Sequence, residues 1–127
     1  MGVIADLKWL AKDPRLLRER NFIERLLKLD LYLEKQGKVL LKLIREGKSG
    51  DAHKLVGLMG DEMEFMRRKL GELSARRDFT PSEKKAAADA VYALNVAMNL
   101  LRSTTRPGNK KPEESIWLLN DTLGIAQ

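Results

Sequence analysis

The pattern of hydrophobic and polar positions singles out residues 86–101, which carry one charged side chain, Asp89, in a chain that is 33% charged. Within this stretch, apolar residues recur at helical spacing in two adjacent stripes, one of mostly larger side chains and one of alanines. The first stripe comprises Ala87, Val91, Leu94, Met98 and Leu101, and the second Ala86, Ala90, Ala93 and Ala97. A helix that is apolar over so wide an arc is typical of the centre of a bundle. We therefore predict a buried Ala/Leu/Met-rich central helix over about residues 80–102.

Three residues mark the start of this helix. Thr80 suits the N-cap, Pro81 suits the first helical position, and Glu83, three residues after Thr80, completes a capping box. The alanine stripe would let a neighbouring backbone approach closely, whereas the larger side chains would interdigitate with those of another helix. The sequence thus predicts a sharp N-terminus and two different packing faces for one helix.

A long helical pattern also covers residues 14–46. Its apolar residues recur at steps of three, four or seven and form a heptad-like seam, interrupted at Gln36 and Gly37. The seam consists of Phe22, Leu26, Leu29, Leu33, Leu40 and Ile44. An unbroken helix of this extent would be about 50 Å long at about 1.5 Å per residue. Because that length exceeds a compact bundle of this size, we expect part of the helix to pack on a second copy of the chain.

A third helix is predicted from Asp51, a favourable N-cap, to about residue 75. Its inward stripe is rich in methionine, which fills irregular gaps in cores and also occurs on adaptable binding surfaces; we expect the core role. The stripe consists of Leu55, Met59, Met63, Met66, Leu70 and Leu73. Gly57 and Gly60 lower the intrinsic helicity, so we expect them to mark the close approach of another helix.

Two shorter helices complete the pattern. Residues 3–12 have an amphipathic helical pattern, and Pro112 opens a last helix that Gly124 ends. The last helix has a broad apolar face that includes Trp117, and it is too short to be stable without docking on other helices. The chain is therefore expected to be all-α, with residues 1–127 forming a single-domain bundle of about five helices.

A formal net charge of +6 is the compositional feature with functional content, because it is compatible with nucleic acid or another polyanion as partner. The cations fall on the face of the long helix opposite its seam, in the turn after the third helix, and in and beside a predicted mobile basic loop at residues 103–111. The candidate phosphate-binding residues are Lys28, Lys35, Lys38, Lys42, Arg45, Arg76, Arg77, Arg102, Arg106, Lys110 and Lys111. A solvated lysine-rich face and a loop that is polar for its own reasons are the alternatives.

The two arginines after the third helix are distinguished from those within it. Glu62 and Glu64 stand three or four positions before basic residues of the same helix and are expected to pair with them. Arg76 and Arg77 lie beyond the expected helix end. We therefore expect these two to be better phosphate ligands than the paired arginines.

Catalytic groups are sparse. Without cysteine, the chain has no disulfide, thiolate nucleophile or zinc–thiolate site. His53 is the single histidine, and Asp51, two residues earlier, points to a different side of a helix. The carboxylates of Asp61, Glu62 and Glu64 would need a second acidic motif to hold Mg²⁺, and the sequence offers none. We expect no enzyme, no cofactor and no metal.

The first functional class that fits is a non-catalytic basic module that contacts nucleic-acid backbone without reading sequence, since no helix-turn-helix pattern is present. In size, charge and helical class the chain resembles the small helical subunits of CRISPR effector complexes, which line a nucleic-acid path by stacking on one another. The resemblance implies one subunit of a larger nucleoprotein assembly. The sequence does not distinguish RNA from DNA.

The second class is a homo-oligomeric helical adaptor that binds another protein and no nucleic acid. The seam of residues 22–44 and the face around Trp117 would carry that role. No stretch is suited to span a bilayer and no cleavable signal pattern is present, so we expect a cytoplasmic location and no membrane partner.

Overall fold

The computed structural model describes residues 2–125, and over that range the chain is helical with no strand. Two short 3₁₀ helices precede four α-helices. The elements are η1 (Ala5–Lys12), η2 (Pro14–Leu16), α1 (Arg20–Arg45), α2 (Ser49–Ser74), α3 (Pro81–Ser103) and α4 (Pro112–Leu123). The predicted all-α fold class is confirmed.

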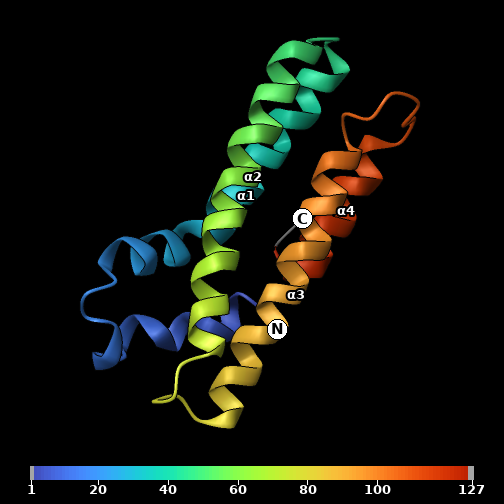
Figure 1. Ribbon diagram of the computed structural model, residues 1–127. Helices are drawn as coiled ribbons and strands as arrows, with labels where there is room; N and C mark the ends of the chain where they lie inside the picture. The colour runs from blue at the N-terminus through green and yellow to red at the C-terminus, as the bar shows by residue number, and fades with distance from the viewer. Residues whose placement is uncertain (1, 126–127) are drawn as a thin grey trace.

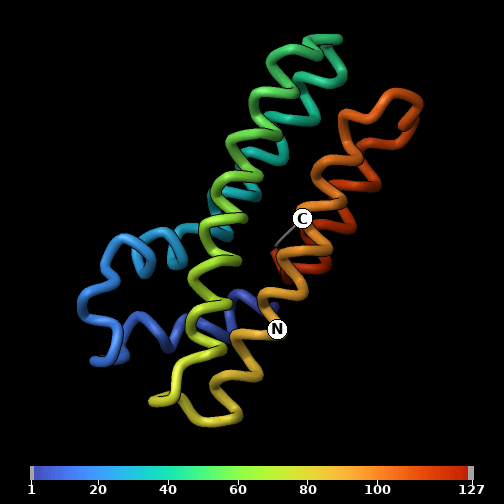
Figure 2. The backbone as a smooth tube through the Cα atoms, in the orientation of Figure 1, coloured from blue at the N-terminus to red at the C-terminus, as the bar shows by residue number. Residues whose placement is uncertain are grey.

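The helices form two hairpins, α1 with α2 and α3 with α4 (Figure 1). Helix α2 packs along α3, α4 packs against α3 and α1, and η1 contacts both α1 and α3. The α1–α2 turn and the α3–α4 loop lie at one end of the molecule, and the α2–α3 turn lies at the other (Figure 2). The fold therefore places the connections within the two hairpins at one end and the connection between the hairpins at the other.

The core is built from most of the stripe residues that the sequence predicts, whereas Leu55, Ala86 and Val91 are only partly buried. In α3 the buried residues are Ala87, Ala90, Ala93, Leu94, Ala97, Met98 and Leu101. In α2 they are Ala52, Met59, Met63, Met66, Leu70 and Leu73. The methionines fill the core as expected, and the buried Ala/Leu/Met-rich stripe of α3 is confirmed. The opposite side of α3 faces solvent, where Tyr92 is 73% exposed.

The capping box at the start of α3 is present as predicted. The Thr80 hydroxyl accepts a hydrogen bond from the Glu83 backbone N–H at 3.1 Å, and the Glu83 carboxylate accepts one from the Thr80 N–H at 2.8 Å. We expect Thr80→Ala to lower the free energy of unfolding by about 1 kcal/mol, because a helix-end N–H loses its partner. Urea denaturation measures the loss, with Ser82→Ala as the neighbouring exposed control. Equal values for the two variants would contradict this role of the cap.

The long helix is shorter than the predicted 14–46. It begins at Arg20, because Glu19 has φ −105° and ψ 41°, outside the helical region. Residues of η2 form a separate turn that buries Leu16 to 2% exposure, so tertiary anchoring overrides the helical pattern there. With 26 residues, α1 is about 39 Å long at about 1.5 Å per residue.

The seam of α1 is covered by the chain's own helices. Its members Phe22, Leu26, Leu29, Leu33 and Leu40 are each at most 1% exposed. Gly37 is buried too, and a Cβ placed on it would meet Cγ2 of Ile116 in α4 at 3.4 Å. Ile44, the last member, is half-buried. The buried part of the seam is therefore not available to a second copy, and self-association stays a prediction.

Helix α2 differs from its prediction in two respects. It begins at Ser49, before Asp51, and no side chain caps its start. A Cβ built on Gly57 or Gly60 would have nothing within 4 Å, so these glycines do not mark a close helix approach. That expectation is wrong because the two glycines line an open groove between α2 and α3 instead.

Candidate nucleic-acid interface

Five of the predicted phosphate ligands lie exposed on the outward face of α1, opposite the buried seam: Lys28, Lys35, Lys38, Lys42 and Arg45. Lys28, Lys35 and Lys42 recur every seven residues, which places neighbours about 10 Å apart along the axis at about 1.5 Å per residue. We call these three the lysine row. Among the described residues, none of the three has a carboxylate within ion-pair distance. Their ammonium groups are therefore not held in ion pairs, although Lys28 lines a small hollow with Glu24 and Glu62.

The other two cations of this face lie toward α4 and are paired. Lys38 lies 3.5 Å from Glu34 on the same helix. Arg45 lies 3.4 Å from Glu113 in the first turn of α4. Both pairs are exposed, and such pairs contribute little to stability. A competing anion can therefore displace either carboxylate at a small cost in free energy.

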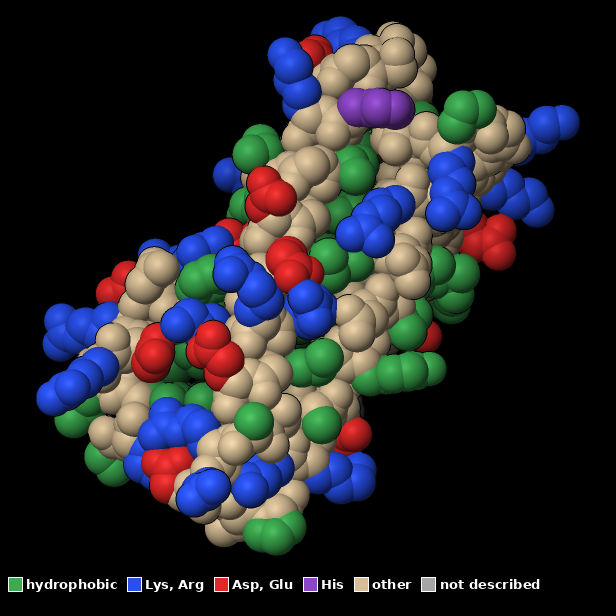
Figure 3. Space-filling model, in the orientation of Figure 1, with side chains coloured by type: hydrophobic (Ala, Val, Ile, Leu, Met, Phe, Trp, Pro, Cys, Tyr) green, Lys and Arg blue, Asp and Glu red, His purple; other side chains and the backbone are tan. Residues whose placement is uncertain are grey.

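The cations of the α3–α4 loop lie at the same end of the molecule as the last turn of α1. Arg106, Lys110 and Lys111 are exposed and have no ion-pair partner within residues 2–125. Lys and Arg side chains gather over this loop, whereas over α2 they alternate with Asp and Glu (Figure 3). Because Arg45 reaches Glu113, two residues after Lys111, the loop and the α1 face adjoin.

Hydrogen bonds organise the same loop. The Asn109 side chain donates to the Ser103 carbonyl at 2.6 Å and accepts from the Lys111 backbone N–H at 2.9 Å. Gly108 supplies the positive φ of 87° that the turn needs. The predicted mobility of residues 103–111 stays a prediction, but these bonds define how Lys111 enters α4.

The structure does not bring Arg76 and Arg77 to this surface, because the α2–α3 turn lies at the opposite end of the molecule (Figure 1). Arg76 donates two hydrogen bonds to Asp78, at 2.9 and 2.6 Å, and lies 5.0 Å from the centre of the Phe79 ring. The pairing lowers the pKa of Asp78. The expectation that Arg76 is unpaired is therefore wrong, since the turn itself supplies a carboxylate. Arg77 is exposed.

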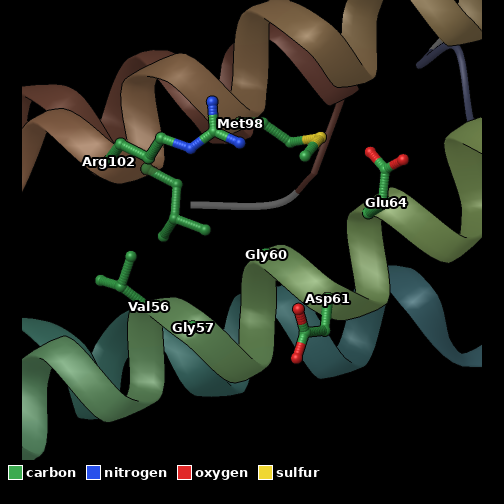
Figure 4. A pocket seen from close by; sticks show the side chains of 8 residues that line it. Val56, Gly57, Gly60, Asp61, Glu64, Met98 and Arg102 are labelled. Atoms are coloured by element: carbon green, nitrogen blue, oxygen red, sulfur yellow. The ribbon is translucent and has the colours of Figure 1, made fainter.

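Arg102 is also separate from the α1 face. It lines a groove of about 330 Å³ between α2 and α3, across from Asp61 and Glu64 (Figure 4). The pKa of Glu64 is lowered chiefly by its hydrogen bonds from Arg67. Because this groove lies between α2 and α3 and not on α1, Arg102 does not extend the basic surface.

One structural arginine was missed by the sequence reasoning. Arg15 donates to Asp13 at 2.6 Å and to Glu83 at 2.9 Å, and its guanidinium lies 4.0 Å from the centre of the Phe79 ring. These contacts join η2 to the start of α3. The sequence indicates the pairing of Arg15 with Asp13, because the two residues are two positions apart. It does not indicate the pairing with Glu83, which is 68 positions away.

This network gives stability a specific pH dependence. Hydrogen bonds from Arg15 hold the pKa of Asp13 and of Glu83 below their usual 3.8 and 4.5. Carboxylates with lowered pKa values stabilise the fold fully above their unfolded values, and that stability is lost as the pH falls through the folded ones. We expect the melting temperature to be constant between neutral pH and about pH 5 and to fall below about pH 4.5. Arg15→Gln should melt several degrees lower at neutral pH and show a weaker acid dependence; parallel curves for both proteins would contradict this.

The acidic cluster on α2 is engaged in ion pairs. Arg25 donates to Glu62 at 2.8 Å while lying 3.7 Å from the centre of the Phe65 ring, and Arg67 donates to Glu64 at 2.8 Å. The expected partner of Glu62 within α2 is thus replaced by one from α1. Among residues 2–125 no group of three His, Asp or Glu side chains could hold a metal ion.

The site residues therefore divide by location. The outward face of α1 and the adjoining end of the bundle carry the lysine row, Lys38, Arg45 and the loop cations. Arg76, Arg77 and Arg102 lie elsewhere.

Within the described range, no helix has the length and hydropathy that a bilayer crossing requires. No protein-family model, curated protein or solved structure matches the chain at a significant level.

Proposed function

We propose that this chain is a non-catalytic subunit that binds the phosphate backbone of nucleic acid along the outward face of α1. The lysine row carries the proposal, because its three cations are exposed, regularly spaced and without a carboxylate partner among the described residues. Lysine is a compact point charge on a flexible stem, which suits contact with phosphate oxygens more than the reading of base edges. Binding is therefore expected to be independent of sequence.

The dimensions fit a short run of strand. From Lys28 to Lys42 the row spans about 21 Å at about 1.5 Å per residue, which corresponds to about six phosphates of a duplex strand at about 3.4 Å each. Leu31, 71% exposed, and Val39, 40% exposed, lie on the same face. Apolar side chains beside the cations suit contact with a neighbouring protein subunit, which favours a role within a nucleoprotein assembly.

Replacing the lysine row tests the proposal. The triple variant Lys28→Ala, Lys35→Ala, Lys42→Ala should bind a labelled oligonucleotide at low salt at least about tenfold more weakly than the parent, as phosphate contacts are lost. The matched control replaces Lys12, Lys54 and Lys84, which also lack a described carboxylate partner and lie off the α1 face. Fluorescence anisotropy measures both. Equal weakening by the two triples would show that net charge, and not the lysine row, governs binding.

A protein-binding adaptor is the second candidate, favoured by exposed apolar side chains on α2 and α3. Leu58 is 61% exposed and Tyr92 is 73% exposed. Light scattering over a range of concentrations tests its homo-oligomeric form. A rise in mass with concentration would support the adaptor, whereas a strict monomer at high concentration would contradict self-association.

A further inference from the structure

We infer that the hollow between α1 and α4 holds an unpaired base of a single strand, stacked on Trp117, and that the protein therefore prefers single-stranded nucleic acid to duplex. The inference rests on the proposed function and names the form of its ligand. The hollow has a volume of about 230 Å³. Its lining includes Lys38, Leu41, Arg45, Ile116, Trp117 and Asn120.

The hollow is continuous with the basic face of α1. Lys38 and Arg45 line it, and each stands three residues after a member of the lysine row, Lys35 or Lys42, on the same exposed side of the helix. A strand whose phosphates follow the row thus passes along the rim of the hollow. Its two acidic rim residues are each held by one of these cations, Glu34 by Lys38 at 3.5 Å and Glu113 by Arg45 at 3.4 Å.

Trp117 supplies the aromatic surface. Its side chain is 52% exposed although it belongs to a helix packed on the core. Every base has an aromatic face, so stacking on a tryptophan is tolerant of sequence, in keeping with backbone-directed binding. Combining an aromatic ring with a cationic track along the backbone is the arrangement by which single strands are bound without sequence preference.

Asn120, one turn after Trp117, is the second observation that points to a ligand. Its residue is 8% exposed, and its side-chain oxygen has no hydrogen-bond partner among the described residues. Buried amides are normally satisfied, and a base that enters the hollow supplies a partner once the shielded amide turns toward it. A base carries both donors and acceptors on its edge, and an amide can turn to meet either. Leu41 and Ile116 give the same hollow apolar walls against which a planar ring packs.

A duplex cannot use these features, because its bases are stacked on one another and their edges are paired. It would meet only the lysine row and the loop cations. If the protein binds by charge alone, single strand and duplex should not differ by the contribution of a stacked base. If one base also stacks on Trp117, the affinity for single strand should exceed that for duplex.

Tryptophan fluorescence tests stacking directly. In a Trp9→Phe background, which leaves Trp117 as the emitting tryptophan, addition of a single-stranded oligonucleotide should quench the emission. Inorganic polyphosphate should compete for the lysine row without the same quenching. Trp117→Leu should bind the single strand about 5- to 100-fold more weakly, the loss typical of one stacked base. Its duplex affinity and its salt dependence should be those of the parent, and Tyr92→Leu, an exposed aromatic on α3, is the matched control.

Asn120→Leu separates a binding role from a structural one. It should weaken single-strand binding while the melting temperature stays equal or rises, because an unsatisfied amide is removed. The inference is overturned if Trp117→Leu binds the single strand as tightly as the parent, if it loses duplex affinity equally, or if polyphosphate quenches as strongly as the oligonucleotide. In those cases the proposed function still stands if the triple lysine variant binds nucleic acid more weakly than the parent. A parent protein that binds no strand overturns the proposed function and this inference together.

Discussion

Leu33→Ala lowers the free energy of unfolding by about 3 kcal/mol. Leu33 is 0% exposed and lies in the middle of the α1 seam, among side chains that close packing prevents from collapsing fully into the space left behind. Because the seam is covered within one chain, the loss should be the same at low and high protein concentration. Urea unfolding at two concentrations measures both quantities.

Leu31→Ala is the control for this substitution. Leu31 belongs to the same helix but is 71% exposed, so its replacement should change the free energy of unfolding by at most about 0.5 kcal/mol. A loss for Leu33→Ala that depends on protein concentration would mean that the seam packs on a second copy after all.

Gly124→Ala is expected to destabilise the protein by about 2 kcal/mol or more, for two reasons that act together. Gly124 has φ 72°, a left-handed conformation that costs a residue with a Cβ about 1 kcal/mol. A Cβ at this position would also collide with the backbone of Gly2, which lies directly against the end of α4. The N-terminal segment would have to move to accommodate it.

Gly108→Ala separates the two contributions. Gly108 also has a positive φ, 87°, but a Cβ on it would meet nothing within 4 Å. Its replacement should therefore cost only the conformational part, about 1 kcal/mol. Thermal unfolding of the two variants compares them, and equal losses would contradict the close approach of Gly2 to Gly124.

The parts of the fold that the sequence predicts are those that depend on neighbours along the chain. The spacing of three to seven residues predicts the capping box of Thr80 and Glu83 and the inward stripes of α2 and α3. The glycine at position 124 predicts the end of α4. The start of α1 is not predicted in this way, because burial of Leu16 and the contact of Arg15 with Glu83 are tertiary. Gly57 and Gly60 mislead for the same reason, since sequence does not tell a close approach from an open groove.

The candidate site likewise has features that the local sequence predicts and features that depend on tertiary contacts. Exposure of the α1 cations is predictable, because they lie opposite an apolar seam. Which cations are neutralised is not, since Arg45 meets Glu113 from 68 positions away and Arg25 meets Glu62 from 37. Arg76 could have been recognised as paired, because Asp78 stands two residues later. The hollow between α1 and α4 has no sequence signal, as its walls come from separate helices.

The salt dependence of binding to a labelled single strand tests the central claim most directly. If the lysine row contacts phosphates, the logarithm of the association constant falls with the logarithm of salt concentration with a slope of about −2 or steeper, at about 0.7 per contact. The triple lysine variant should show a slope shallower by about 2, with the control triple unchanged. A parent chain that fails to bind at low salt, or that binds with an affinity independent of salt, would contradict the account.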